Sequence, residues 1–360
     1  MHTDRIARAP QHHRQESIMK HQRPLATVAS AAGLALMLAA SALIWQHFTA
    51  PPVYAYIIGE TVPASEAGPL AAYVEAGLTV RRASLQSAER ASSLATLDIA
   101  ETAAGPVLLN WQARVDDPFM TLAVPPQDVV TLSGVLKRHV PAQSKVFAWW
   151  DTSRQINALG ALDFMFDRHL GLPLFLPAHW SGQRANIEKI ENSFWAGNVR
   201  DATDERERFR QFARALTAPE AEGMAMLRSL AGEGKPIVLI LHLRDIILLG
   251  QMFPDRLGVA FQDFGASNDV HGMVRWVHAW LEEHKYTAYG VLPASGQPVR
   301  AVALTDAASA RTLAARLLPF MGNEQHDVAG ATLVYQAGGF SVFEIAPADN
   351  TKLAISTTQS

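Results

Sequence analysis

The residues best suited to chemistry lie in one short run, where two adjacent tryptophans precede an acid, two hydroxyls, an arginine and a glutamine. The residues of this run that we nominate for binding are Trp149, Trp150, Asp151, Ser153, Arg154 and Gln155. Indole and guanidinium groups at this density are typical of recognition surfaces. A structural interpretation fits the pattern equally well: the indoles fill the core and Asp151 caps the next helix.

Further candidates lie elsewhere in the chain, and the fold would have to bring them to the same cleft. They are Asp116, Asp117, His179, Trp180, Trp195, His242 and Arg244. In an enzyme, Asp151 would serve as acid or base and Arg154 as an anion clamp. Asp116 or Asp117 and His179 would then complete the cleft, although an Asp-Asp-Pro run is also a common turn. The catalytic residues themselves remain unknown.

The elements that must position these side chains alternate between strands and helices. Residues 236–241 are continuously apolar, as are strands of a parallel sheet that is covered on both faces. His242 and Arg244 follow this strand directly, and the Trp-Trp-Asp run ends another short strand at 145–150. Ligands bind beyond the carboxyl ends of parallel strands. We therefore predict an α/β fold with a mostly parallel sheet and flanking helices.

The remaining elements follow from apolar spacing and from turn residues. A Gly338-Gly339 pair separates the last two predicted strands and indicates a hairpin. Residues 70–105 are rich in Ala and Ser and show a moderate helical pattern. The other expected strands are 53–58, 107–111, 299–304, 332–335 and 340–345, and the expected helices are 126–139, 155–166, 204–216, 220–230, 273–284 and 307–320.

The first 48 residues predict export and a membrane anchor. Residues 25–45 carry no charge and would just span a hydrocarbon core of about 30 Å as a helix. Because five basic and two acidic residues precede them, the positive-inside rule keeps the N-terminus in the cytoplasm. We expect a basic cytoplasmic tail over 1–24, a single transmembrane helix over 25–48 in the inner membrane, and a periplasmic C-terminal domain. A cleaved signal peptide is the alternative.

The rest of the chain is long enough for a sizeable core. We expect a tether with an Ala- and Ser-rich segment over 49–105, an exported α/β domain over 106–350 and a flexible tail over 351–360. The domain could divide into two subdomains near 200–220. The first 24 residues hold five of the 31 basic and two of the 34 acidic residues, which leaves 26 and 32 and a net charge of about −6. This balance argues against nucleic acid as a partner.

Several kinds of chemistry are excluded. The chain has no cysteine, so it can form no disulfide, Cys-ligated iron–sulfur cluster or covalently attached c-type haem. Glycine-rich phosphate loops and a Gly-x-Ser-x-Gly elbow are absent from the sequence. His271 and His278, seven residues apart on a predicted helix, would lie about 10 Å apart, too far to share one metal ion. We therefore predict no cofactor and no metal site.

The run from Val146 to Ile156 is similar to the Trp-Trp-Asp-Tyr-Gly signature of oligosaccharyltransferase catalytic subunits. Thr152 and Ser153 stand where that signature has Tyr-Gly. That family holds its metal and its lipid-linked sugar in a membrane domain with many spans, whereas we expect one span here. The resemblance therefore implies glycan or peptide recognition at this loop and does not support glycosyl transfer.

The chain as a whole resembles the hydroxylamine oxidation protein HaoB family. The residues that carry the resemblance are 110–118, 149–155, Pro177-x-x-Trp180 and Glu191-x-x-Phe194-Trp195. Members of that family are anchored, exported proteins encoded beside the multihaem hydroxylamine oxidoreductase. The resemblance implies an accessory role at the outer face of the inner membrane. The oxidoreductase or an associated cytochrome would be the partner, and no catalytic residue is carried over.

Two functions from different classes compete. The first is an accessory protein that binds or assembles a partner such as hydroxylamine oxidoreductase and has no redox centre of its own. It would use exposed aromatic rings, namely Trp149, Trp150, Trp180 and Trp195. The second is an enzyme or a ligand-binding module with its site at the Trp149-Trp150-Asp151 loop. Because the sequence contains no catalytic signature, we favour the first.

Overall fold

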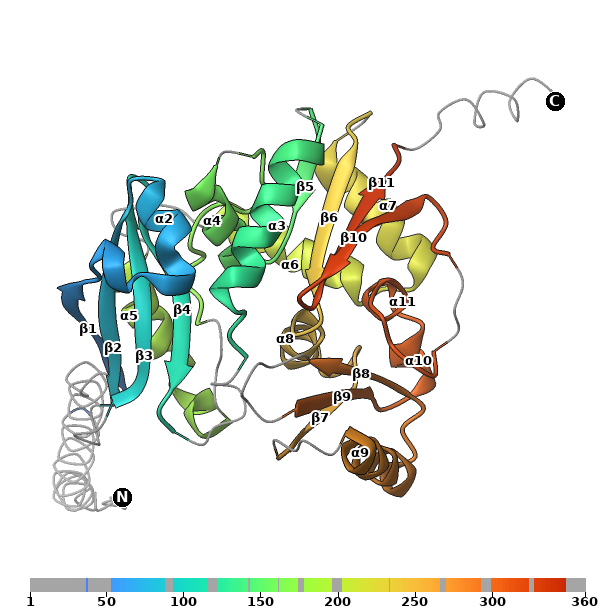
Figure 1. Cartoon of the computed structure of the whole chain (residues 1–360). Coiled ribbons are helices and arrows are strands. Elements are labelled where there is room, and N and C mark those ends of the chain that lie inside the picture. The colour runs from blue at the N-terminus through green and yellow to red at the C-terminus, as the bar shows by residue number, and fades with distance from the viewer. Residues whose placement is uncertain are drawn as a thin grey trace, which may run out of the picture. The chain divides into compact units, whose positions relative to one another are not determined.

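The computed structural model describes the backbone of Met37 and of eleven segments that begin at Val53. These are residues 53–87, 93–115, 122–141, 143–160, 162–173, 178–195, 203–232, 234–265, 270–292, 299–323 and 327–347. The chain divides into one unit over 1–52 and a second over 53–360. All the elements below belong to the second unit (Figure 1).

The N-terminal part of this unit is a four-stranded antiparallel sheet with the strands in chain order. Its strands are β1 (Tyr54–Thr61), β2 (Thr79–Ser87), β3 (Ser93–Thr102) and β4 (Gly105–Ala113). Ala95, Leu97 and Ile99 occupy alternate positions on β3 and are buried together, as a strand's two-residue period requires. The short helices η1 (Ala64–Glu66), η2 (Gly68–Leu70) and α2 (Ala71–Glu75) join β1 to β2. Tyr73 of α2 is buried against Val80 in a separate cluster.

A second sheet is mixed and has the order β10-β11-β6-β5. Its strands are β5 (Lys145–Phe147), β6 (Ile237–His242), β10 (Ala331–Ala337) and β11 (Phe340–Ile345). β5 runs parallel to β6, whereas β11 is antiparallel to both of its neighbours. All six residues of β6 are buried, because alternate residues enter the cores on the two faces of the sheet.

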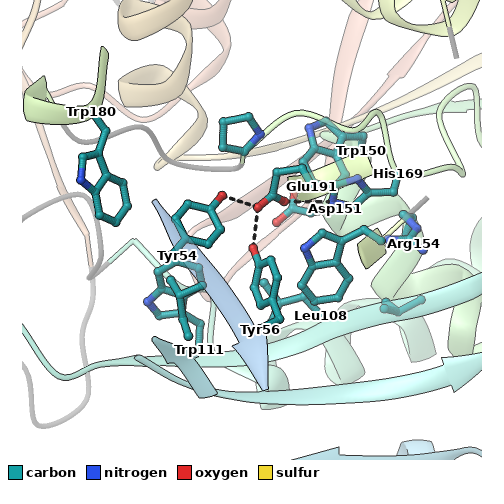
Figure 2. Close-up of a pocket in the computed structure, with 14 residues that line it drawn as sticks. Tyr54, Tyr56, Leu108, Trp111, Trp150, Asp151, Arg154, His169, Trp180 and Glu191 are labelled. Carbon is teal, nitrogen blue, oxygen red and sulfur yellow. Dashed lines mark hydrogen bonds and ion pairs between the residues drawn. The ribbon is translucent and has the colours of Figure 1, made fainter. Parts of the chain in front are cut away.

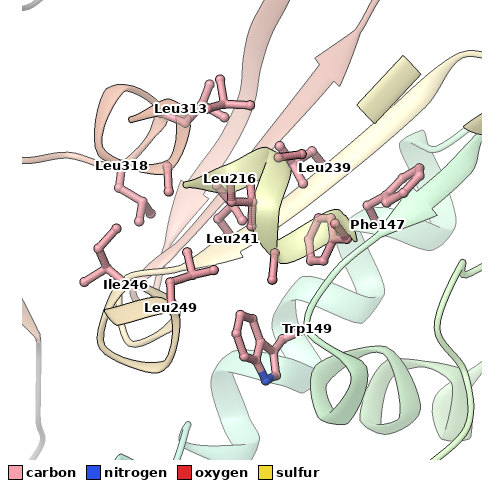
Figure 3. Packing of buried hydrophobic residues seen from close by; sticks show 14 of the residues in the cluster. Phe147, Trp149, Leu216, Leu239, Leu241, Ile246, Leu249, Leu313 and Leu318 are labelled. Carbon is pink, nitrogen blue, oxygen red and sulfur yellow. The ribbon is translucent and has the colours of Figure 1, made fainter. Parts of the chain in front are cut away.

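Helices cover both faces of this mixed sheet. In the larger core, Leu239 and Leu241 of β6 pack with Leu216, Leu249 and Leu313 (Figure 3). Those leucines come from α6 (Thr203–Leu216), α8 (Asp245–Met252) and α11 (Leu313–Leu317), and α7 (Glu220–Ala231) belongs to the same core. The other face packs against α3 (Pro126–His139) and α4 (Trp150–Leu159).

A third sheet is antiparallel, in the order β7-β9-β8. Its elements are β7 (Val259–Phe264), β8 (Ala288–Leu292) and β9 (Val299–Leu304), with α9 (Val270–His284) against one face and the short α10 (Ala307–Ala310) after β9. Val277 and Trp280 of α9 are buried against Ala301 and Ala303 of β9. Val302 of β9 faces the other way and joins the larger core.

The prediction of a mostly parallel sheet is wrong. Among the pairs of named strands in the described residues, β5 with β6 is the one parallel pair. The segment 70–105, which showed a helical pattern, contains β2 and β3. Alanines at inward positions, such as Ala83 and Ala95, weaken the apolar alternation from which a strand is recognised. The class is therefore α and β with antiparallel and mixed sheets.

The predicted tail over 1–24, the final tail over 351–360 and, apart from Met37, the predicted transmembrane helix over 25–48 lie outside the described residues. Within the described part, no helix is long and apolar enough to cross a membrane. Several predicted elements are confirmed, among them β1, β4, β6 and the β10–β11 hairpin. The helix expected over 307–320 is instead the two short helices α10 and α11.

Candidate functional site

The two adjacent tryptophans stand where β5 leads into α4, and both are buried. The Trp149 ring lies edge-on to Phe209 of α6, with centroids 5.0 Å apart, inside the larger core (Figure 3). Trp150 is the first residue of α4, and its ring lies edge-on to the His169 imidazole at 4.5 Å. Their side chains are about 5 % exposed or less. Of the two interpretations that the sequence allowed, these rings therefore fit the one in which the indoles are buried, and they form no exposed recognition surface.

Asp151 forms a buried ion pair instead of capping α4. Its Oδ2 accepts a hydrogen bond from Arg244 Nη2 at 2.6 Å, and the same nitrogen lies 3.2 Å from Thr152 Oγ1. Arg244 follows β6, and the parallel pairing of β5 with β6 brings the ends of the two strands together. The expectation that these two runs meet at one sheet edge is thus confirmed.

His242 is the last residue of β6, pairs with Phe340 of the β10–β11 hairpin and does not line the pocket described below. Its Nδ1 accepts from the Arg244 backbone N–H at 3.1 Å, so its Nε2 carries the proton and lies 3.2 Å from the Gly338 carbonyl oxygen. Burial, with the nearby Arg244 charge, lowers the pKa of His242 to about 3, which keeps the ring neutral. The neighbouring Asp245 accepts from the His242 N–H, and burial raises its pKa to about 7.

The remaining polar residues of α4 attach this helix to β4. Arg154 Nη2 donates to the Pro106 carbonyl oxygen at 2.7 Å, and Gln155 Nε2 donates to the Leu108 carbonyl oxygen at 2.8 Å. Ser153 is completely buried within the helix. Burial lowers the pKa of Arg154 to about 10, so the group stays cationic at neutral pH. These contacts fix the α4 face that carries Asp151.

A pocket lies between the N-terminal sheet and the helices α4 and α5 (Arg184–Trp195), as Figure 2 shows. It contains about 580 Å³ of space between atoms, its open mouth included. Six aromatic side chains line it: Tyr54, Tyr56, Trp111, Trp150, Trp180 and Trp195. Trp180 lies on the short helix η4 (Ala178–Gln183), with its ring 5.4 Å from that of Tyr54. Apolar walls of this kind are usual in small-molecule sites.

Glu191 of α5 is the acidic centre of this pocket (Figure 2). The hydroxyls of Tyr54 and Tyr56 both donate to its Oε1, the second at 2.6 Å. Trp195 is a further hydrogen-bonding neighbour of the carboxyl. Burial nevertheless raises the pKa of Glu191 to about 7, because these neutral donors do not fully compensate for lost hydration.

His169 lines the pocket beside Glu191. Its Nδ1 accepts from the Gly171 N–H at 3.0 Å, so the proton of the neutral ring is on Nε2, which lies 3.8 Å from Glu191 Oε2. Burial lowers the pKa of His169 well below its usual value, and the charges of Arg154 and Arg206 lower it further. The ring is therefore neutral, and it stacks on Trp195 with centroids 5.5 Å apart.

Asp151 lines the pocket, and one of its two carboxylate oxygens has no hydrogen-bond partner among the described residues. Asp151 Oδ1 is buried and accepts no hydrogen bond from any described residue, although Oδ2 of the same carboxylate is paired with Arg244. A buried acceptor without a donor costs about 1–3 kcal/mol. Such a group at a pocket wall points to a ligand that would supply the donor.

The pocket brings together five of the residues nominated from sequence: Trp150, Asp151, Arg154, Trp180 and Trp195. Five others lie elsewhere: Trp149, Ser153, Gln155, His242 and Arg244. Asp116, Asp117 and the side chain of His179 lie outside the described residues. Within the described part, no group of three or more His, Asp or Glu side chains is placed to hold a metal ion.

Sequence reasoning did not nominate Tyr54, Tyr56, His169 or Glu191. A signal existed for the tyrosines, because Tyr-x-Tyr on a strand places both rings on one face. Glu191 precedes Trp195 by four residues, so the two share a helix face. Nothing in the sequence around His169 marks it, because its role depends on contacts with residues far away in the chain.

The fold and the pocket together define a protein of α and β elements, with a buried aromatic pocket that contains carboxylates beside an antiparallel sheet. No curated protein and no solved structure matches the chain. A family model described as HaoA-associated protein HaoB matches residues 19–345. The chain therefore belongs to the HaoB family, which confirms that resemblance. The similarity to oligosaccharyltransferases stays a prediction.

Proposed function

We propose that this protein is an accessory protein that binds hydroxylamine oxidoreductase, HaoA, and assists its assembly or operation. The observation that carries the proposal is the family match, since the family is described as HaoA-associated. In this role the protein has no redox centre of its own. The lack of cysteine supports that part, because thioether-bound haem and Cys-ligated iron–sulfur clusters both need this residue. A cytochrome associated with the oxidoreductase is the alternative partner.

We propose that the domain works on the periplasmic side of the inner membrane. The support comes from the sequence, in which basic residues precede the uncharged stretch 25–45. Protease added to spheroplasts should digest the domain while a cytoplasmic marker stays intact. Protection of the domain until the cells are lysed would contradict this location.

The contact surface that we propose is the outer face of α9. Trp276 is 53 % exposed and Val274 is 49 % exposed, whereas Val277 and Trp280 of the same helix are buried against its sheet. Because Trp is enriched among interface hot spots, the exposed Trp276 is the candidate anchor of this face, and Val274 is a second exposed apolar residue on the helix. Arg275 lies between them and is exposed as well.

The test is affinity capture of the tagged full-length chain from mildly solubilised native membranes, with HaoA quantified by mass spectrometry. We expect Trp276→Ala to lower HaoA recovery about tenfold, which corresponds to a loss of roughly 1.4 kcal/mol of binding free energy. The matched control is Leu333→Ala on β10, another exposed apolar side chain, which should leave recovery unchanged. Unchanged recovery with Trp276→Ala would overturn the α9 surface, and no HaoA with the wild type would overturn the function.

A second candidate function is ligand binding in the pocket, with no reaction assigned. The unpaired Asp151 Oδ1 favours it, because the protein alone does not satisfy this acceptor. Glycans or acceptor peptides are the ligands that the Trp-Trp-Asp resemblance suggests. A saturable change in tryptophan fluorescence on their addition would support that ligand class, and the lack of any change would exclude it.

A further inference from the structure

We propose that the pocket binds a small primary ammonium ion, with Asp151 Oδ1 accepting from its N–H, Glu191 as the counter-charge and the aromatic faces around it. This inference rests on ligand binding, the second proposed function, and names the ligand class. It is independent of HaoA binding. Three observations support it: the charges in the pocket, the unpaired acceptor and the aromatic walls.

The charges in the pocket leave Glu191 without a cationic partner. Arg244 is shared by Asp151, at 2.6 Å, and Asp245, at 3.6 Å. The charge of Arg154 faces Asp151, Asp167 and Glu205.

Near Glu191 itself, the one ion-pair candidate among the described residues is His169, which is neutral. An ionised Glu191 is thus held by neutral donors alone. A cation in the pocket would replace the hydration that burial has removed.

The unpaired acceptor decides which kind of cation fits. Asp151 lines the same pocket as Glu191, and its Oδ1 is buried without a hydrogen-bond donor among the described residues. A ligand N–H can satisfy it, whereas a quaternary ammonium ion offers no donor. An anion is excluded at this oxygen, because two negative groups would meet in a buried site.

The aromatic walls suit a cation that is still partly hydrophobic. Ring faces attract ammonium groups within about 6 Å of the ring centroid, and the interaction strengthens when the site is desolvated. The rings of Trp150 and Trp195 flank His169, while Tyr54 and Trp180 lie on the other side of Glu191 (Figure 2). The space of about 580 Å³ includes the open mouth, so the enclosed part of the pocket is smaller than this volume. We therefore expect the ligand to be a short-chain amine.

Binding should tighten with pH, because the ion needs Glu191 in its ionised form. Its pKa is about 7 in the free protein, so the ionised fraction rises about tenfold between pH 6 and pH 8. Among the other lining groups, the tyrosines and His169 stay neutral and Arg154 stays cationic in this range. Asp245 lies outside the lining, but it shares Arg244 with Asp151 and also has a pKa of about 7, so it adds a smaller pH dependence. We expect affinity to rise by about the same factor.

The experiment titrates the full-length protein with ethylammonium chloride and, separately, with ethanol as a neutral ligand of similar shape. Tryptophan fluorescence gives the affinity, and saturation-transfer NMR reports contact, both at constant ionic strength and at pH 6, 7 and 8. Glu191→Gln should weaken ethylammonium binding about tenfold at pH 8 and remove most of the pH dependence. The matched control is Glu188→Gln, which removes a charge one turn earlier on α5, from a residue outside the pocket lining.

The expected result is that ethylammonium binds more tightly than ethanol and tetramethylammonium, with the pH dependence above. Trp180→Leu on the half-buried pocket wall should weaken binding in a folded protein, which keeps the test valid if Glu191→Gln does not fold. Equal affinity for ethylammonium and ethanol would overturn the cation while leaving ligand binding in place. If amines, glycans and peptides all fail to bind, ligand binding falls as well.

Discussion

Arg244 is the residue on which the junction of β5, β6 and α4 depends. Its guanidinium is 2 % exposed and is shared between two carboxylates, while a further N–H lies 3.4 Å from the Leu122 carbonyl oxygen. A buried ion pair contributes little net stability when it forms, because both groups lose their hydration. The loss of one member is costly, because the other stays buried without a partner.

Arg244→Met should lower the free energy of unfolding by about 3–5 kcal/mol, because it leaves Asp151 without its cation. Urea denaturation at pH 7 measures the change. The control is Arg81→Met, which breaks an ion pair of the same 2.6 Å length to Glu101 at the surface. That variant should cost less than about 1 kcal/mol. Equal losses for the two variants would show that burial of the Arg244 pair has no energetic consequence.

Glu191 makes stability fall as pH rises. Its pKa is about 7 in the folded protein and near the ordinary 4.5 when unfolded, so the folded state binds the proton more tightly. The stabilisation from this group is complete below pH 4.5 and is lost as pH rises through 7. Across this range the free energy of unfolding falls by roughly 3 kcal/mol because of Glu191.

Glu191→Gln should reduce the difference in unfolding free energy between pH 5 and pH 8 by about that amount. Urea titrations at the two pH values measure it. Asp245, whose pKa burial also raises to about 7, supplies a residual decrease with the same sign. Glu188→Gln should retain the full pH dependence. If Glu191→Gln kept the wild-type difference, the carboxyl would not titrate in this range.

At the scale of elements, β6 is the central strand, and its neighbours on both sides depend on it. Leu239 is completely buried and packs in the larger core. Leu239→Ala should lower the free energy of unfolding by about 2–5 kcal/mol through lost burial and the cavity left behind. Leu333→Ala on the edge strand β10, where the side chain is 48 % exposed, should change it by less than about 0.5 kcal/mol. Chemical denaturation of both variants measures the two losses. Equal losses would contradict a larger contribution of β6 than of β10 to the free energy of unfolding.

The same elements show what the sequence could predict. β6 was predictable because residues 236–241 are apolar at every position. The hairpin was predictable because glycine pairs favour tight turns, and both glycines have positive φ, 58° at Gly338 and 80° at Gly339. β2 and β3 were not, because alanine fits a helix and a strand equally well. Strand direction was not predictable either, since the antiparallel insertion of β11 beside β6 depends on contacts between residues about 100 positions apart.

The candidate site divides in the same way. Trp150, Asp151 and Arg154 were predictable from the density of functional groups in one run. Glu191 and His169 were not, because the pocket forms where α5 and the chain after β5 meet the N-terminal sheet. The burial of Trp149 was also hidden, since an indole at a strand end can face the core or the solvent.

At the scale of the whole molecule, the two proposed binding sites lie on different parts of the fold. The pocket uses β1, β4, α4 and α5, whereas the proposed HaoA contact uses α9 on the third sheet. Mutations at sites without shared partners usually act independently. Trp276→Ala should therefore leave ethylammonium affinity unchanged, and Trp180→Leu should leave HaoA recovery unchanged. Loss of both activities in either variant would show that the two surfaces are coupled.

The most direct test of the central claim is the amount of HaoA captured with the tagged wild-type protein from mildly solubilised native membranes. We predict recovery of HaoA in near-equal amount, with recovery lowered about tenfold by Trp276→Ala and unchanged by Leu333→Ala. HaoA at background level with the wild-type protein would contradict the account.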